Sequence, residues 1–149
     1  MAETTVRDRL RWMPSAETHR RIKRLWVRHS IAEDRRDIPG LISTLTPACV
    51  YELVPTGDRW DGHAGATAFY TGLLGAFPDI HFDLTDIVVG PQGVFEVADV
   101  TATHERAWVG FEPTGRRVKF RVLIHFPWDP DAELFGGERI YLDRAELRP

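Results

Sequence analysis

Two residues in the C-terminal half of the sequence have side chains suited to proton transfer. His104 ends the alternating segment VADVTATH, and Glu138 lies in the last such segment, LFGGERIYLD. A neutral imidazole beside a cavity can take a proton from a carbon acid, or return one, near neutral pH. A carboxyl group among apolar side chains can do similar work, because burial disfavours its charged form. We therefore predict His104 and Glu138 as catalytic residues.

Both residues also have a structural interpretation. His104 could form hydrogen bonds with the backbone or with Glu105 at the end of a strand. Glu138 could form an ordinary cross-strand ion pair. Its candidate partners on the neighbouring strand are Arg116, Arg117 and Arg121. The sequence alone leaves these alternatives open.

The strands that must position these side chains are visible as alternating patterns. Residues 93–128 contain two long alternating segments on either side of a turn at residues 113–115. Such alternation predicts paired β-strands with one buried face. The second segment carries an unbroken apolar row made of Val118, Phe120, Val122, Ile124, Phe126 and Trp128. A pair this long needs other elements to cover its apolar face.

Three further strands are predicted, at residues 48–54, 80–89 and 134–143, with a loop at 56–60. The dipeptide Gly136-Gly137 suggests a bulge in the last of them. A shift of phase at this bulge would exchange Glu138 for Arg139 on the inner face. The side chain of Glu96, near the start of its strand, is expected to be solvated.

Three helices are predicted from apolar residues at helical spacing. The first begins near Ser15, and its inner stripe consists of Ile22, Leu25, Trp26, His29 and Ala32. The second is short, is capped by Asp37 and is ended by Pro47. The third begins at Asp61 and ends at Pro78, and its stripe consists of Ala66, Phe69, Tyr70, Leu73, Leu74 and Phe77.

This order of elements predicts an α+β fold. Helices that precede a run of hairpin-linked strands indicate a curved, mostly antiparallel sheet wrapped around the N-terminal helices. A bent sheet of this kind tends to enclose a pocket at its mouth. We expect residues 1–15 to form an N-terminal arm and residues 16–149 to form a single domain.

Composition excludes several classes of function. A net charge of −3 gives little attraction for nucleic acid phosphates. The single cysteine, and the absence of histidines four residues apart, argue against a metal site. No glycine-rich loop offers a cradle for a nucleotide, so we expect no cofactor. A membrane-spanning stretch and a signal peptide are absent from the sequence, which makes a cytoplasmic protein the default.

Several short motifs in this order resemble the SnoaL-like polyketide cyclase family. They are GHAG at 62–65 with FY at 69–70, AFPD at 76–79, ATH at 102–104, GFEPTGR at 110–116 and ERIYLD at 138–143. The resemblance implies the cone-shaped fold of the nuclear transport factor and ketosteroid isomerase superfamily. It also implies a histidine beside the substrate in the ATH motif, and a homodimer formed through the outer face of the sheet.

The alternation and the resemblance together predict a hydrophobic binding pocket. Its predicted substrate-binding residues are Trp26, His29, Tyr51, Trp60, Phe69, Leu73, Phe77, Val100 and Ile140. Tyr51 and His29 could donate hydrogen bonds to a substrate carbonyl or enolate. Few other polar groups are expected there, which suits a flat, hydrophobic ligand with a few oxygens.

Two functions fit this pocket. The first is cofactor-independent acid–base cyclisation or isomerisation of a hydrophobic carbonyl compound, such as a polyketide. In that hypothesis His104 or Glu138 removes an acidic α-proton. The second is a non-catalytic carrier of a hydrophobic metabolite, in which the same residues serve as core.

Overall fold

Within residues 4–148, which the computed structural model describes, six strands form one sheet in the order β2-β1-β6-β5-β4-β3. The strands are β1 (Leu45–Leu53), β2 (Asp58–Asp61), β3 (His81–Gly90), β4 (Gly93–Thr103), β5 (Arg117–Asp129) and β6 (Leu134–Leu142). Neighbouring strands pair antiparallel, except for β1 and β6, which pair parallel. The predicted α+β class with a mixed, mostly antiparallel sheet is confirmed.

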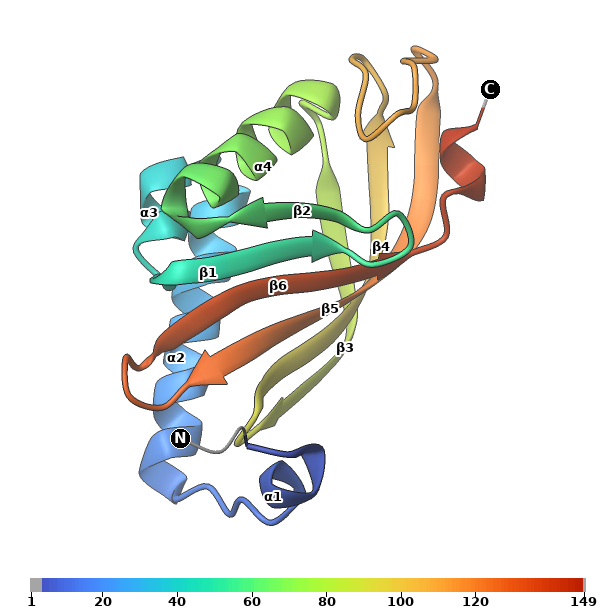
Figure 1. Cartoon of the computed structure of the whole chain (residues 1–149). Coiled ribbons are helices and arrows are strands. Elements are labelled where there is room, and N and C mark those ends of the chain that lie inside the picture. Colours follow the sequence, from blue (N-terminus) through green and yellow to red (C-terminus); the bar gives the residue numbers. More distant parts are fainter. Residues whose placement is uncertain (1–3, 149) are drawn as a thin grey trace.

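Four α-helices lie within the described residues, and α2, α3 and α4 lie on the side toward which the sheet curls (Figure 1). They are α1 (Val6–Leu10), α2 (Ala16–Asp34), α3 (Ile38–Ile42) and α4 (Gly62–Ala76), with a short 3-10 turn η1 (Ala145–Leu147). Ser15 caps α2 by accepting a hydrogen bond from the Thr18 N–H at 3.0 Å. Asp37 caps α3 in the same way, through the Gly40 N–H at 3.0 Å. The segment predicted as an arm thus contains a helix of its own, α1.

Two boundaries differ from the prediction. The helix expected to run to Pro47 ends at Ile42, and β1 begins at Leu45. Pro47 is tolerated in the strand because the register between β1 and β6 is irregular between Leu45 and Val50. The predicted loop at 56–60 contains most of β2, a four-residue strand whose polar sequence shows no alternation but which gains pairing from β1.

The predicted bulge in β6 decides which side chain faces inward. Four residues of β5, from His125 to Trp128, lie opposite five residues of β6, from Phe135 to Arg139. Gly137 has a φ of +107°, a left-handed conformation that favours glycine. Because β6 accommodates its extra residue at Gly137, the side chain of Glu138 is buried and that of Arg139 is exposed. Glu138 is also the register partner of Tyr51 on β1.

Candidate active site

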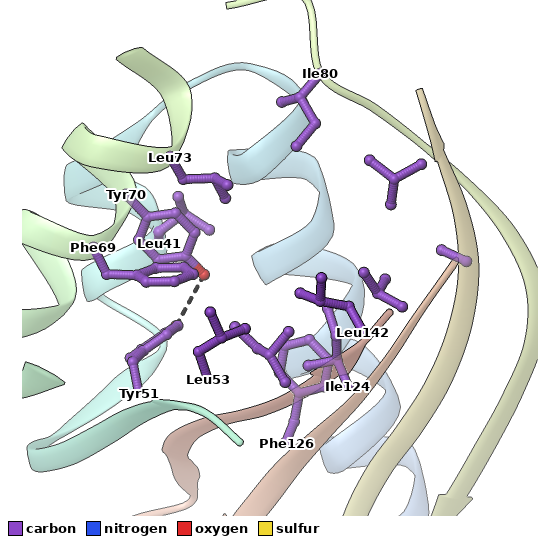
Figure 2. Packing of buried hydrophobic residues seen from close by; sticks show 14 of the residues in the cluster. Leu41, Tyr51, Leu53, Phe69, Tyr70, Leu73, Ile80, Ile124, Phe126 and Leu142 are labelled. Atoms are coloured by element: carbon purple, nitrogen blue, oxygen red, sulfur yellow. Dashed lines mark hydrogen bonds between the residues drawn. The ribbon is translucent and has the colours of Figure 1, made fainter. Parts of the chain in front are cut away.

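A buried carboxyl group, that of Glu138, is the centre of a hydrogen-bonded cluster. Its Oε1 accepts hydrogen bonds from the Tyr70 hydroxyl at 2.6 Å and from the Tyr51 hydroxyl at 3.1 Å. The two hydroxyls lie 2.9 Å apart, and Figure 2 shows both rings pointing toward each other from α4 and β1. The Nε2 of His29 lies 3.1 Å from the same Oε1. Three elements and the bulge of β6 therefore converge on one oxygen atom.

The contacts of His29 fix its tautomer. The Thr44 hydroxyl donates to the Leu41 carbonyl at 2.6 Å, so it can only accept from the His29 Nδ1–H, at 2.7 Å. The remaining nitrogen, Nε2, faces Glu138. Nε2 lies 3.1 Å from Glu138 Oε1 and also 3.1 Å from the Tyr70 hydroxyl, so it belongs to the same hydrogen-bonded cluster as both groups.

The two tyrosines act as permanent donors. Burial raises the pKa of Tyr51 and of Tyr70 well above their usual value, and the nearby Glu138 charge raises it further. Both phenols therefore keep their protons at any physiological pH. Their hydrogen bonds to Oε1 hold the carboxylate in one orientation.

Two further carboxyl groups lie close to this cluster. Burial raises the pKa of Glu96 to about 7, with a contribution from the Glu138 charge, although the Trp26 indole N–H donates to it at 2.9 Å. Burial also raises the pKa of Glu33 well above its usual value, and repulsion from Glu138 and Glu96 adds to this. Both groups therefore favour their neutral forms far more than exposed glutamates do.

Two internal cavities adjoin these groups. The apolar cavity has a volume of about 30 Å³ and lies between α4 and strands β3, β5 and β6. Its walls are Glu33, Phe69, Tyr70, Leu73, Ile80, Phe82, Trp108, Phe120, Val122, Ile124, Glu138, Ile140 and Leu142. Figure 2 looks across part of this space, between Leu73 and Ile80 on one side and Ile124 and Leu142 on the other.

The polar cavity has a volume of about 80 Å³ and lies between α2 and strands β3 to β5. Its walls are Trp26, His29, Ser30, Glu33, Asp34, Phe82, Leu84, Glu96, Ala98 and Phe126. Glu33 and Phe82 belong to both cavities. Each cavity holds only a few water molecules, and these two side chains separate them.

A comparison with protein families identifies the chain. A model described as SnoaL-like polyketide cyclase matches residues 17–131. The chain belongs to the SnoaL-like polyketide cyclase family. The resemblance inferred from the motifs is thereby confirmed, while a comparison with curated proteins finds no match.

Solved structures of other SnoaL-like and NTF2-like proteins share the fold. AclR of Streptomyces galilaeus, a proposed hydroxylase, is 24% identical with a TM-score of 0.68, over 85% of this chain and 91% of its own. A proposed SnoaL-like polyketide cyclase of Jannaschia sp. CCS1 is 19% identical with a TM-score of 0.72, over 93% and 99%. IdmH of Streptomyces antibioticus, a proposed polyketide cyclase, is 19% identical with a TM-score of 0.66, over 85% and 94%.

The residues predicted to bind substrate in this SnoaL-like protein lie in three places. Phe69, Leu73 and Ile140 line the apolar cavity, and Trp26 and His29 line the polar one. Tyr51 contacts Glu138 from outside the cavity walls. The other three predicted residues line neither of these two cavities. They are Trp60, whose ring packs against Phe69 at 5.1 Å, and the buried Phe77 and Val100.

The structure separates the two predicted catalytic residues. His104 is fully buried just beyond β4 and stacks on the Phe77 ring, with centroids 4.9 Å apart. Neither of its ring nitrogens has a hydrogen-bond partner among the described residues, and its ring lines neither cavity. Glu138, by contrast, lines the apolar cavity directly.

The predicted solvation of Glu96 is wrong, since only 8% of that residue is exposed.

One set of side chains in the SnoaL-like domain has the spacing of a metal site. His29, Glu33 and Glu138 each place one potential ligand atom within 4.8 Å of the others. However, Glu138 Oε1 already accepts two phenol hydrogen bonds, and His29 Nε2 is engaged with that same oxygen. A cation would have to break these contacts, so the donor set fits a proton-sharing cluster better than a metal.

Among the described helices, none has the length and apolarity needed to cross a membrane.

The raised pKa of Glu96 predicts a pH-dependent stability. The folded protein binds this proton more tightly than the unfolded chain, so the contribution is complete below pH 4.5 and is lost as the pH rises through about 7. Glu96→Gln cannot ionise, so it avoids this loss of stability, and its side-chain carbonyl can still accept the hydrogen bond from the Trp26 indole N–H. Relative to the wild type, we expect it to be about 3 kcal/mol more stable at pH 8 and close to equal at pH 5. Urea unfolding of both proteins at the two pH values measures this, and an equal difference at both would contradict it.

Proposed function

We propose that this SnoaL-like protein catalyses the cyclisation or isomerisation of a hydrophobic carbonyl compound by acid–base chemistry. The observation that supports this most directly is the setting of Glu138. One oxygen of its buried carboxyl group accepts from the Tyr51 and Tyr70 hydroxyls, and the side chain forms part of an otherwise nearly apolar cavity wall. A base held in this way is oriented before the substrate arrives, which lowers the barrier to proton transfer.

In the proposed reaction Glu138 removes a proton from the carbon next to a carbonyl group. The C–H electron pair forms the enolate, and the substrate oxygen takes the negative charge. In a cyclisation, the enolate carbon attacks a second carbonyl group and forms the new C–C bond, while the π electrons of that carbonyl move onto its oxygen, which takes the proton back from Glu138. In an isomerisation, the extended enolate takes the proton back at another carbon. Neither route changes the oxidation level of the whole substrate, so the proposal includes no cofactor and no metal.

A substrate of polyketide size needs more room than the cavities provide at rest. Phe82 separates the two cavities and is only half-buried on the edge strand β3. Rotation of this ring would remove one of the two side chains between the cavities and widen the space that runs from Glu138 past Glu33 to Glu96. The apolar walls favour a hydrophobic body, and the carboxyl groups favour a few oxygens or hydroxyls on it.

The experiment is deuterium exchange of 2-tetralone, a hydrophobic ketone with acidic α-protons, followed by NMR in D2O. This assay detects α-proton removal without knowledge of the natural product. We expect the protein to accelerate exchange at the activated α-carbon above the buffer rate. Binding of the ketone without accelerated exchange would refute the enzyme and favour the carrier of a hydrophobic metabolite.

We also propose that the protein forms a homodimer through the outer face of the sheet. This face carries exposed Val88 and Phe95, which are register partners on β3 and β4, and exposed Leu123 and Tyr141, which are register partners on β5 and β6. Leu123→Glu places a charge in this patch and is expected to convert a dimer into monomer in sedimentation velocity experiments. Val27→Glu, on the exposed side of α2, is the matched control and is expected to change nothing.

A further inference from the structure

A second carboxyl group, that of Glu33 on α2, faces the same space as Glu138. Both side chains line the apolar cavity, and Glu33 also lines the polar one. One carboxylate oxygen of each lies within 4.8 Å of the other. A carbonyl oxygen and its α-carbon are only about 2.4 Å apart, given the C=O and C–C bond lengths. A substrate whose α-carbon reaches Glu138 can therefore place its carbonyl oxygen beside Glu33, when the C=O bond points toward α2.

The two carboxyl groups differ sharply in their hydrogen bonds. Glu138 accepts hydrogen bonds from the Tyr51 and Tyr70 hydroxyls, and His29 Nε2 lies 3.1 Å from the same oxygen. Among the hydrogen bonds within residues 4–148, Glu33 receives none, and His29 Nε2 lies 4.0 Å from its Oε2. Only 19% of its side chain is exposed. An ionised carboxylate without donors is costly in such a place, whereas the carboxylic acid is a hydrogen-bond donor in its own right.

We propose that Glu33 is a further catalytic residue, which donates its O–H to the substrate carbonyl oxygen while Glu138 removes the α-proton. This inference rests on the proposed function and names the group that receives the developing charge. As the C–H bond breaks, the proton passes to Glu138 and the electron pair forms the new C=C bond. The carbonyl π electrons move onto oxygen, where the Glu33 O–H stabilises the enolate or transfers its proton to give the enol. Base and acid are thus two carboxyl groups whose surroundings give them opposite tasks.

The protonated state of Glu33 sets the alkaline limit of the reaction. The charged and titratable groups that face it come from every element packed against it. They are Glu96 on β4, Glu138 on β6, His29 and Asp34 on α2, and Arg36 just beyond α2. The carboxylates favour the neutral form of Glu33, and Arg36 opposes it. Exchange is therefore expected to decline at alkaline pH as Glu33 ionises.

The test compares two replacements of Glu33 in the 2-tetralone exchange assay, with Glu112→Gln on the surface as the inert control. Glutamine keeps an N–H donor but cannot ionise, whereas leucine removes the donor and fills the space. We expect Glu33→Gln to lower the exchange rate by only about threefold and to abolish the alkaline decline. Glu33→Leu is expected to lower the rate about 100-fold, the usual cost of one lost oxyanion donor. Circular dichroism and urea unfolding show whether each variant is folded.

Three results would overturn this inference. Glu33→Gln as slow as Glu33→Leu would mean that Glu33 acts as a carboxylate. A full rate in Glu33→Leu would mean that it takes no part. An alkaline decline that persists in Glu33→Gln would assign the titration to another group. In each case an exchange rate that still depends on Glu138 would leave the proposed function standing, whereas a wild-type protein without any exchange would refute both.

Discussion

Replacing Glu138 with glutamine is expected to lower the rate of α-proton exchange by about 100-fold to 10,000-fold, the range typical for loss of a general base. Glutamine has the same shape, and its carbonyl oxygen can still accept from the Tyr51 and Tyr70 hydroxyls. The cluster therefore survives without a group that can take the proton. NMR exchange rates for the folded variant and the wild type at pH 7 measure the effect.

His104→Phe is the variant that separates the two predicted catalytic residues. Its ring stacks on Phe77, and neither ring nitrogen is hydrogen-bonded among the described residues, so phenylalanine replaces it without breaking a polar contact. We expect a rate within about tenfold of the wild type, far above that of Glu138→Gln. A full rate in Glu138→Gln together with a collapse in His104→Phe would reverse the assignment and make the histidine the base.

The fold could be predicted from sequence because its signals are local. The alternation of residues 93–128 predicts the long hairpin of β4 and β5 and shows which side chains face the core. The helical stripe from Ile22 to Ala32 fixes the face that α2 presents to the sheet. Neither pattern needs information from a distant part of the chain. β2 was missed because its pairing comes from β1 and not from its own four residues.

The site was only partly predictable because its chemistry depends on contacts between distant residues. Glu96 lies near the start of β4, where a solvated side chain is the usual expectation. It is buried because Trp26, 70 residues earlier, covers it and donates a hydrogen bond to it. The spacing of Tyr70 predicts only a core residue of α4. No residue near it in the sequence indicates a hydrogen bond to Glu138, which is 68 residues away.

Glu33 is the one missed residue whose position the sequence does signal. It follows His29 by four residues and Trp26 by seven, so it continues the inner stripe of α2 by one further turn. The apolar stripe itself ends at Ala32, because the next four residues are all charged. A charged residue at the spacing of an apolar stripe lies on the inner face of the helix, as His29 does.

Gly137→Ala is expected to be strongly destabilising, although it adds only one methyl group. A Cβ at this position would lie 2.0 Å from the carbonyl oxygen of Val50 and 2.6 Å from its carbonyl carbon, both of them backbone atoms of β1. The φ of +107° adds a conformational penalty for any side chain. We expect a loss of roughly 3 to 4 kcal/mol in the free energy of unfolding, measured by urea denaturation.

The same substitution also tests how the bulge serves the chemistry. Relief of the clash requires β1 to move away from β6, and these strands carry the register partners Tyr51 and Glu138. A folded Gly137→Ala protein should therefore exchange 2-tetralone more slowly, because Glu138 loses a donor that orients it. Gly72→Ala on the exposed side of α4 is the matched control, since its Cβ would meet nothing within 4 Å. We expect that variant to gain about 0.5 to 1 kcal/mol and to keep its activity, whereas a loss below 1 kcal/mol in Gly137→Ala would show that the bulge tolerates a side chain.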